Sequence, residues 1–65
     1  MPKYPDIEVE LIGQSGNAFY IIGAVLAALR KARVPEEERK NFRIMAMAGD
    51  YDWLLRTVMA YVVVT

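Results

Sequence analysis

The chain has 65 residues, of which 8 are Lys or Arg and 8 are Asp or Glu, so its formal net charge is zero. This balance provides no long-range field toward a phosphate backbone, which disfavours nucleic-acid binding. A chain this short buries only about 60% of the surface that its unfolded form exposes. With no cysteine, no histidine and 55% hydrophobic residues, it has no disulfide or ready metal ligand, and we expect a homo-oligomer without a cofactor.

The N-terminal region is expected to lead into a strand. Residues 1–6 include Pro2 and Pro5, which predicts an extended lead-in before a single compact domain at residues 7–65. Apolar and acidic residues then alternate in IEVEL, residues 7–11. Because successive side chains of a strand face opposite sides, this pattern predicts a strand with an apolar inner face and both glutamates outside.

A long helix is expected over residues 18–33, with apolar residues around most of its circumference. Gly23 within it predicts the close approach of another backbone, because glycine costs about 1 kcal/mol relative to alanine in a helix. The apolar run at residues 18–29 would be about 18 Å long as a helix, too short for a hydrocarbon core of about 30 Å. We therefore expect no membrane span and a location in the cytoplasm.

Two further helices are expected next. Pro35 suits the first position of the second helix, and the acidic run at residues 36–38 favours its N-terminus. The basic residues of the following turn are expected to pair with these glutamates. Gly49 is expected as the C′ residue of this helix, and Asp50 as the N-cap of the third helix.

The closing segment YVVVT, residues 61–65, is β-branched or aromatic and is expected to be a strand. The order is then β-α-α-α-β, an α/β (α+β) domain. Since two strands alone do not make a stable sheet, we expect strands of several subunits to pair into an intersubunit sheet. The alternative is that the third helix continues through residues 61–64.

The segment GQSGNAF, residues 13–19, joins the first strand to the first helix. A glycine-rich turn at a helix N-terminus exposes backbone N–H groups at the positive end of the helix dipole, which suits a phosphate or carboxylate. The segment lacks the lysine of a P-loop and the third glycine of a dinucleotide-binding motif. Two interpretations stay open: a turn capped by Asn17 or Ser15, or a ligand site. The candidate binding residues are Gln14, Ser15, Gly16, Asn17, Ala18 and Phe19.

A second candidate segment is GDYDW, residues 49–53. Its aspartates suit the N-cap and first turn of a helix, and Arg56 is spaced to pair with Asp52. Large aromatic side chains beside polar ones form pocket walls or interface anchors as well as cores. In an oligomer, Arg56 could instead face a ligand anion bidentately. The candidate binding residues here are Tyr51, Asp52, Trp53 and Arg56.

The sequence offers no catalytic group. Neither Cys nor His is present to act as nucleophile or base, and Ser15 has no evident partner to activate it. The carboxylates are explained by the outer face of a strand or by helix termini. We therefore expect no catalytic residue and no enzyme.

With these motifs, the chain resembles a family of small proteins of unknown function encoded by tailed bacteriophages and prophages. The resemblance rests on VELIG, GQSGNAF, ALRKA, and GDYDWLL with RTVM, and extends from Val9 to Val64. The family pattern usually has glycine at the position of Arg33 and a more polar closing strand than YVVVT. The first departure makes a glycine cap after the first helix doubtful, and the second suggests stronger self-association.

The resemblance implies a phage context but no activity. Accessory proteins of this size in phages bind a host protein or sequester a signalling molecule of a defence system. We expect a non-catalytic homo-oligomer that sequesters a small anionic, nucleotide-derived molecule in the host cytoplasm. The alternative is a protein-interaction module that inhibits a host protein.

Overall fold

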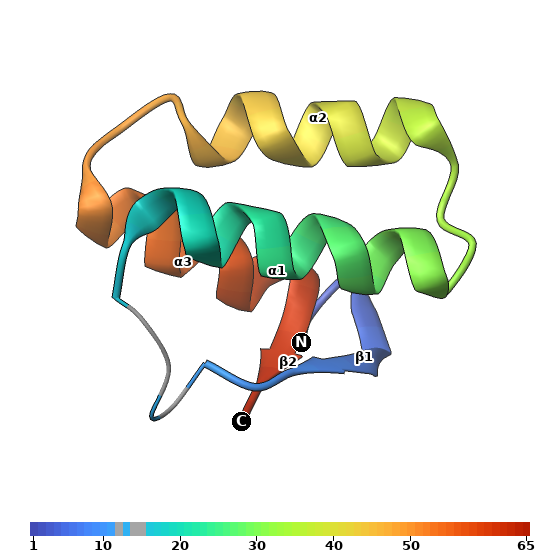
Figure 1. Ribbon diagram of the computed structural model, residues 1–65. Helices are drawn as coiled ribbons and strands as arrows, with labels where there is room; N and C mark the ends of the chain where they lie inside the picture. Colours follow the sequence, from blue (N-terminus) through green and yellow to red (C-terminus); the bar gives the residue numbers. More distant parts are fainter. Residues whose placement is uncertain (12, 14–15) are drawn as a thin grey trace.

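The computed structural model describes residues 1–11, 13 and 16–65. Within these residues, the chain has the predicted order β-α-α-α-β and forms an α+β fold (Figure 1). The elements are β1 Tyr4–Val9, α1 Ala18–Lys31, α2 Glu36–Ala46, α3 Tyr51–Tyr61 and β2 Val62–Val64. No helix in this described part of the chain is long and apolar enough to cross a membrane.

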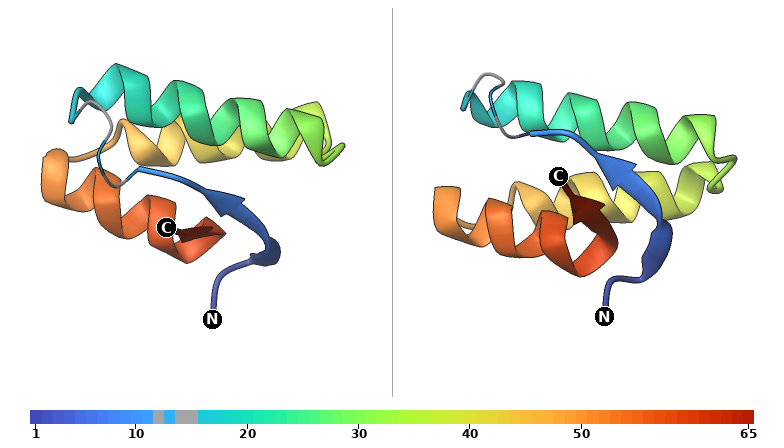
Figure 2. Two further views of the ribbon diagram at one scale, coloured as in Figure 1. Left: turned by 60° about the horizontal axis from the view of Figure 1, so that its bottom comes forward. Right: turned by 90° about the horizontal axis from the view of Figure 1, so that it is seen from below.

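The helices lie on one side of a small sheet. In Figure 1, α2 lies along the top, α1 and α3 lie beneath it, and the two strands lie at the bottom. Seen from below in Figure 2, the strands are nearest the viewer and the helices lie behind them. Because α1 and α2 run antiparallel, the start of α1 lies at the same end of the molecule as the end of α2 and the start of α3 (Figure 1).

Strands β1 and β2 pair with each other in parallel, with Tyr4 opposite Val62. The register is irregular between Tyr4 and Glu8, the stretch that contains Pro5, and a proline has no N–H for the ladder. The strand nevertheless includes this stretch. Its expected start at Ile7, after a separate lead-in, is therefore corrected to Tyr4.

Backbone hydrogen bonds extend this pairing beyond both strands. The N–H of Lys3 donates to the carbonyl oxygen of Ala60 at 2.8 Å, and the N–H of Thr65 donates to the carbonyl oxygen of Val9 at 3.0 Å. Helix α3 ends at Tyr61, and residues 62–64 are strand. The alternative in which α3 continues through this segment is therefore wrong.

Helix α1 ends two residues earlier than expected, in a Schellman motif. The N–H of Val34 donates to the carbonyl oxygen of Leu29, and the N–H of Arg33 donates to that of Arg30, both at 3.0 Å. Arg33 has a φ of 65°, the left-handed conformation that glycine adopts most readily. An arginine thus occupies the C′ position, and the turn forms without glycine.

The boundaries of α2 and the ion pairs of its side chains differ from those expected from the sequence. Pro35 is the N-cap and not the first helical residue, so α2 begins one residue later than expected, at Glu36. The C-cap is Met47, so Gly49 is not the C′ residue. Among the described residues, the ion pairs are Lys3–Glu38 and Asp52–Arg56. The expected pairing within α2 is therefore wrong, because Glu38 turns toward β1 instead.

The core fills the space between the helices and the inner face of the sheet. The rings of Phe42 and Tyr61 meet edge to face, with centroids 5.0 Å apart. Helix α1 contributes a buried strip, but a Cβ atom at Gly23 would meet nothing within 4 Å, so the expected close approach of a backbone is wrong for the single chain. The fully enclosed side chains are those of Val25, Leu29, Phe42, Val58 and Val62.

Candidate functional site

The two candidate motifs meet at the end of the molecule where α1 begins, α2 ends and α3 begins. A cleft of about 220 Å³ opens there between the three helices. From the motif GNAF it is lined by Ala18 and Phe19, and from GDYD by Gly49, Asp50 and Tyr51. The remaining lining residues are Ile22, Ala46, Met47 and Leu54. The antiparallel arrangement of α1 and α2 therefore brings together segments that are about thirty positions apart in the sequence.

At the start of α1, Asn17 is the N-cap, as predicted. Its side-chain oxygen accepts hydrogen bonds from the N–H groups of Phe19 at 2.8 Å and Tyr20 at 3.4 Å. These two donors are therefore occupied by the protein itself. Tyr51 reaches toward this turn from α3, because a Cβ atom at Gly16 would lie 3.5 Å from its hydroxyl oxygen. The predicted site residues Gln14 and Ser15 lie outside the described residues.

At the start of α3, the two aspartates have the roles predicted for helix residues. Asp50 is the N-cap and accepts a hydrogen bond from the N–H of Trp53 at 2.9 Å. Asp52 pairs with Arg56, with 3.0 Å between the carboxylate oxygen and Nε. The side chains of both are more than 70% exposed, and such pairs contribute little stability. Neither Asp52 nor Arg56 lines the cleft.

Trp53 also lies outside the cleft lining. Its indole Nε1 donates a hydrogen bond to the carbonyl oxygen of Met45 at 2.7 Å, which ties α3 to the last turn of α2. This carbonyl also accepts a hydrogen bond from the N–H of Ala48 at 3.2 Å, in the turn that follows α2. The aromatic residue of GDYDW that faces the cleft is therefore Tyr51, and Trp53 links α3 to α2.

The cleft is apolar, and its charge does not favour an anion. Among its lining residues, all of which the structure describes, Asp50 is the one with a formal charge. Phe19 and Tyr51 are 75% and 46% exposed, so both rings are available to a ligand. Apolar clefts with a few polar groups at the rim take flat rings or aliphatic groups. The cleft can therefore hold the uncharged part of a ligand, and the expected counter-charge from Arg56 is not in it.

A second surface lies one helical turn from the cleft, between α1 and α2. The sequence had suggested only that its basic residues pair with the glutamates of α2. Leu26 follows Ile22 by one turn on α1, and Arg43 precedes Met47 by one turn on α2. Leu26 and Arg43 line a groove between α1 and α2 of about 230 Å³. A sequence signal was present, since Arg39 and Arg43 share one helix face at a spacing of four. Only the packing of α1 on α2 shows that this face borders a groove.

Shifted pKa values occur in a third cluster, formed by Lys3, Tyr4 and Glu38. The Tyr4 hydroxyl donates to the Glu38 carboxylate at 3.2 Å, and the Lys3 ammonium also binds this carboxylate. The hydrogen bond from Lys3 holds the pKa of Glu38 below its usual range, and that same bond raises the pKa of Lys3. Burial raises the pKa of Tyr4. The cluster ties β1 to α2 and activates no nucleophile.

Neither a metal site nor a similar known protein points to a function. Over residues 1–11, 13 and 16–65, no three carboxylates gather closely enough to share a metal ion. Comparison of the chain with known protein families, curated proteins and solved structures found no match. The features of the described chain that bear on function are therefore the cleft, the groove and the exposed side chains around them.

Proposed function

We propose that the protein is a non-catalytic binding protein that sequesters a small anionic, nucleotide-derived molecule. The observation that carries this proposal is that GNAF and GDYD line one apolar cleft, with Phe19 and Tyr51 as its exposed rings. A base or similar flat ring would lie against these side chains, since stacking on an aromatic ring contributes about 1–3 kcal/mol per base. Because the cleft contains no nucleophile or paired acid and base, binding without turnover is the function that it fits.

Self-association is part of the proposal. Large apolar side chains are exposed on all three helices, among them Phe19, Ile44 and Met59. Within the described chain, the sheet has two strands and therefore two outer edges, to which strands of other subunits can add. A homo-oligomer joined in this way would cover apolar surface that a chain of this size exposes. The resemblance to phage proteins is our reason to propose that it acts in the host cytoplasm as a counter-defence protein.

The experiment is native mass spectrometry of the protein purified gently from bacterial cells, followed by calorimetry. We expect a discrete oligomer that retains a small molecule, or that binds members of a panel of cyclic and linear dinucleotides. Phe19→Ser should weaken binding at least tenfold. Met59→Ser is the matched control, because Met59 is 56% exposed on α3 and does not line the cleft.

Two outcomes would overturn the proposal. One is a folded protein that retains nothing and gives no heat with any member of the panel. The other is a nucleotide that binds the Phe19→Ser and Met59→Ser variants equally well.

A second candidate function is inhibition of a host protein. It is favoured by the exposed side chains of Phe19, Met47 and Tyr51, which cluster around the cleft, because aromatic residues and methionine are enriched in protein interfaces. In that case, the protein should capture one host partner at a fixed ratio. Phe19→Ser should abolish this capture. Added nucleotides should leave the capture by the wild-type protein unchanged.

A further inference from the structure

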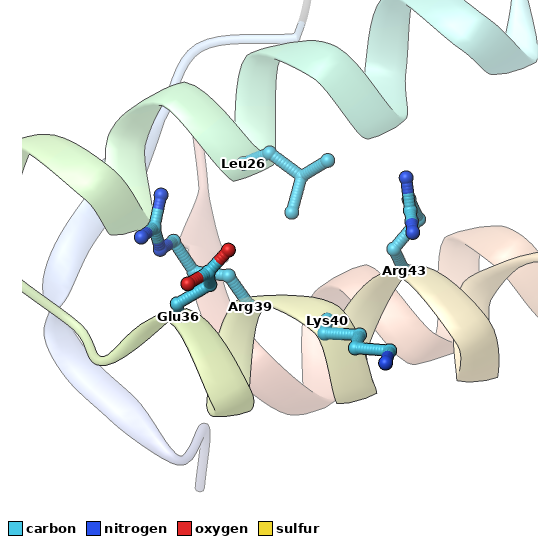
Figure 3. Close-up of a pocket in the computed structure, with 5 residues that line it drawn as sticks. All are labelled: Leu26, Glu36, Arg39, Lys40 and Arg43. Carbon is cyan, nitrogen blue, oxygen red and sulfur yellow. The ribbon is translucent and has the colours of Figure 1, made fainter.

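A groove lined by basic side chains runs between α1 and α2, next to the cleft. Its lining includes Leu26 on α1 and Glu36, Arg39, Lys40 and Arg43 on α2. Figure 3 shows Leu26 pointing from α1 into the space between the helices, with Arg39 and Arg43 extending from α2 toward α1. The neighbouring surface continues the groove along α1 with Arg30 and Lys31. Five of the 8 basic residues of the chain therefore border one surface.

The cations of this groove are not neutralised by the protein. The ion pairs of the described chain are those of Lys3 with Glu38 and Asp52 with Arg56, so no ion pair there involves a groove side chain. Glu36 is the one acidic side chain in the lining. The net charge of zero therefore conceals a local excess of positive charge. The opposite charge lies partly on β1, where Asp6 and Glu8 are exposed.

Arg39 gives the groove a specific unmet requirement. Its Nε atom is buried and has no hydrogen-bond partner. Buried polar atoms are nearly always paired, and a buried donor left unpaired destabilises the fold. Because this atom is covered, an anion in the groove would reach it only after the side chain shifts, whereas the guanidinium as a whole presents its N–H groups in a fork that fits phosphate and carboxylate.

The position of the groove matches the proposed ligand. Arg39 and Arg43 are one turn apart on α2, so their Cβ atoms are about 6 Å apart on one face. Met47, one further turn along, lines the apolar cleft. The two spaces together reach the size range of small-molecule sites, about 300–1,000 Å³. A molecule with a flat ring at one end and phosphates at the other would fit across them.

We infer that the groove between α1 and α2, with Arg39 and Arg43 at its centre, binds the phosphates of the ligand whose ring lies in the cleft. This inference rests on the proposed function. It assigns the anionic half of the ligand to the groove, and not to the helix N-termini or to Arg56, as the sequence had suggested. The ligand class is a nucleotide with at least two phosphates, which could engage both arginines at once.

Inorganic pyrophosphate is the first probe, with ADP and a single-stranded DNA 12-mer as further probes. Pyrophosphate should shift the Nε–H nuclear magnetic resonances of Arg39 and Arg43 in the wild-type protein. The double variant Arg39→Gln/Arg43→Gln should weaken its binding at least tenfold. The control Arg33→Gln/Arg56→Gln removes the same charge from residues outside the groove, and should change binding less than twofold.

The outcomes separate this inference from the proposed function. The inference is overturned if pyrophosphate shifts the amides at the starts of α1 and α3 instead, or if both double variants lose binding equally. If ADP binds the Arg39→Gln/Arg43→Gln variant as tightly as the wild type, and Phe19→Ser weakens that binding, the inference fails and the proposed function stands. If pyrophosphate binds the groove but ADP binds no more tightly, the groove is an anion site with no ring bound in the cleft, so the assignment to a nucleotide and the proposed function both fail. Tighter binding of the 12-mer than of ADP would overturn the assignment to a small molecule.

Discussion

Gly49 lies directly against the side chain of Trp53. A Cβ atom at position 49 would stand 2.6 Å from Cγ and 2.7 Å from Cβ of Trp53, closer than carbon atoms approach without a shift. The ring has little freedom to move away, because its Nε1 is bound to the carbonyl oxygen of Met45. Glycine is required here by space and not, as the sequence suggested, by the end of α2.

Gly49→Ala should therefore lower the free energy of unfolding by about 1–3 kcal/mol, the usual cost of overpacking. Urea unfolding followed by the fluorescence of Trp53, the one tryptophan of the chain, measures this directly. Gly23→Ala is the matched control: its Cβ would meet nothing within 4 Å, so alanine should raise stability by about 0.5–1 kcal/mol. Equal effects of the two changes would contradict the proposed contact.

Arg33→Gly should stabilise the protein. Arg33 has a φ of 65°, which costs a residue with a Cβ about 1–2 kcal/mol, and part of that gain is lost to the greater freedom of glycine in the unfolded chain. We expect a net rise of about 0.5–1 kcal/mol in the free energy of unfolding. Lys31→Gly, within the last turn of α1, should lower it by a similar amount. A thermal melt of both variants tests the pair, and a lower melting temperature for Arg33→Gly would argue against the left-handed turn.

Removal of the cap at α1 should fray its first turn. Asn17→Ala leaves the N–H groups of Phe19 and Tyr20 without the acceptor that they use, and should cost about 1 kcal/mol. Asn17→Ser keeps an acceptor and should retain most of the stability. Hydrogen exchange at the amides of Phe19 and Tyr20 reports the local effect. Unchanged protection of both amides in the alanine variant would be incompatible with this cap.

The stability should depend on pH through the cluster of Lys3, Tyr4 and Glu38. The pKa of Glu38 is lowered by Lys3, so its contribution is present above the usual carboxyl range and is lost as the pH falls through and below about 4. The pKa values of Lys3 and Tyr4 are raised, so their contributions are lost as the pH rises above about 10.

Urea midpoints measured between pH 3 and pH 11 should therefore fall at both ends of the range. Glu38→Gln should reduce the loss at low pH strongly and the loss at high pH only in part, because burial, and not Glu38, is the main cause of the raised pKa of Tyr4. Glu37→Gln is a suitable control, since Glu37 is exposed and makes no ion pair in the described chain. If the two variants show the same pH profile, the cluster does not cause the dependence.

The order of elements could be predicted because each is encoded locally. Alternation marks β1, the caps Asn17 and Asp50 mark two helix starts, and the valines at residues 62–64 mark β2. Contacts between distant residues were missed. Glu38 is paired with Lys3, 35 positions away, whereas local spacing favoured the arginines of its own helix.

The candidate site was predicted in part, for the same physical reason. GNAF and GDYD are recognisable as junctions, and the structure brings Phe19 and Tyr51 to one cleft. Ile22 and Met47 could not be selected, because an apolar residue in a helix gives no sign of which neighbour it will face. Arg39 was assigned to helix pairing, and only the packing of α1 on α2 places its Nε beside a groove.

The parallel pairing of β1 with β2 also fixes when the fold can be completed during synthesis. Tyr4 is synthesised 58 residues before its partner Val62. At about 5–20 residues per second, β1 waits several seconds with an open edge. The helices have close neighbours in sequence and can pack first, whereas the sheet must close a long loop. Asp6 and Glu8 are exposed on β1, and charged side chains on an edge strand disfavour its pairing with another chain in that interval.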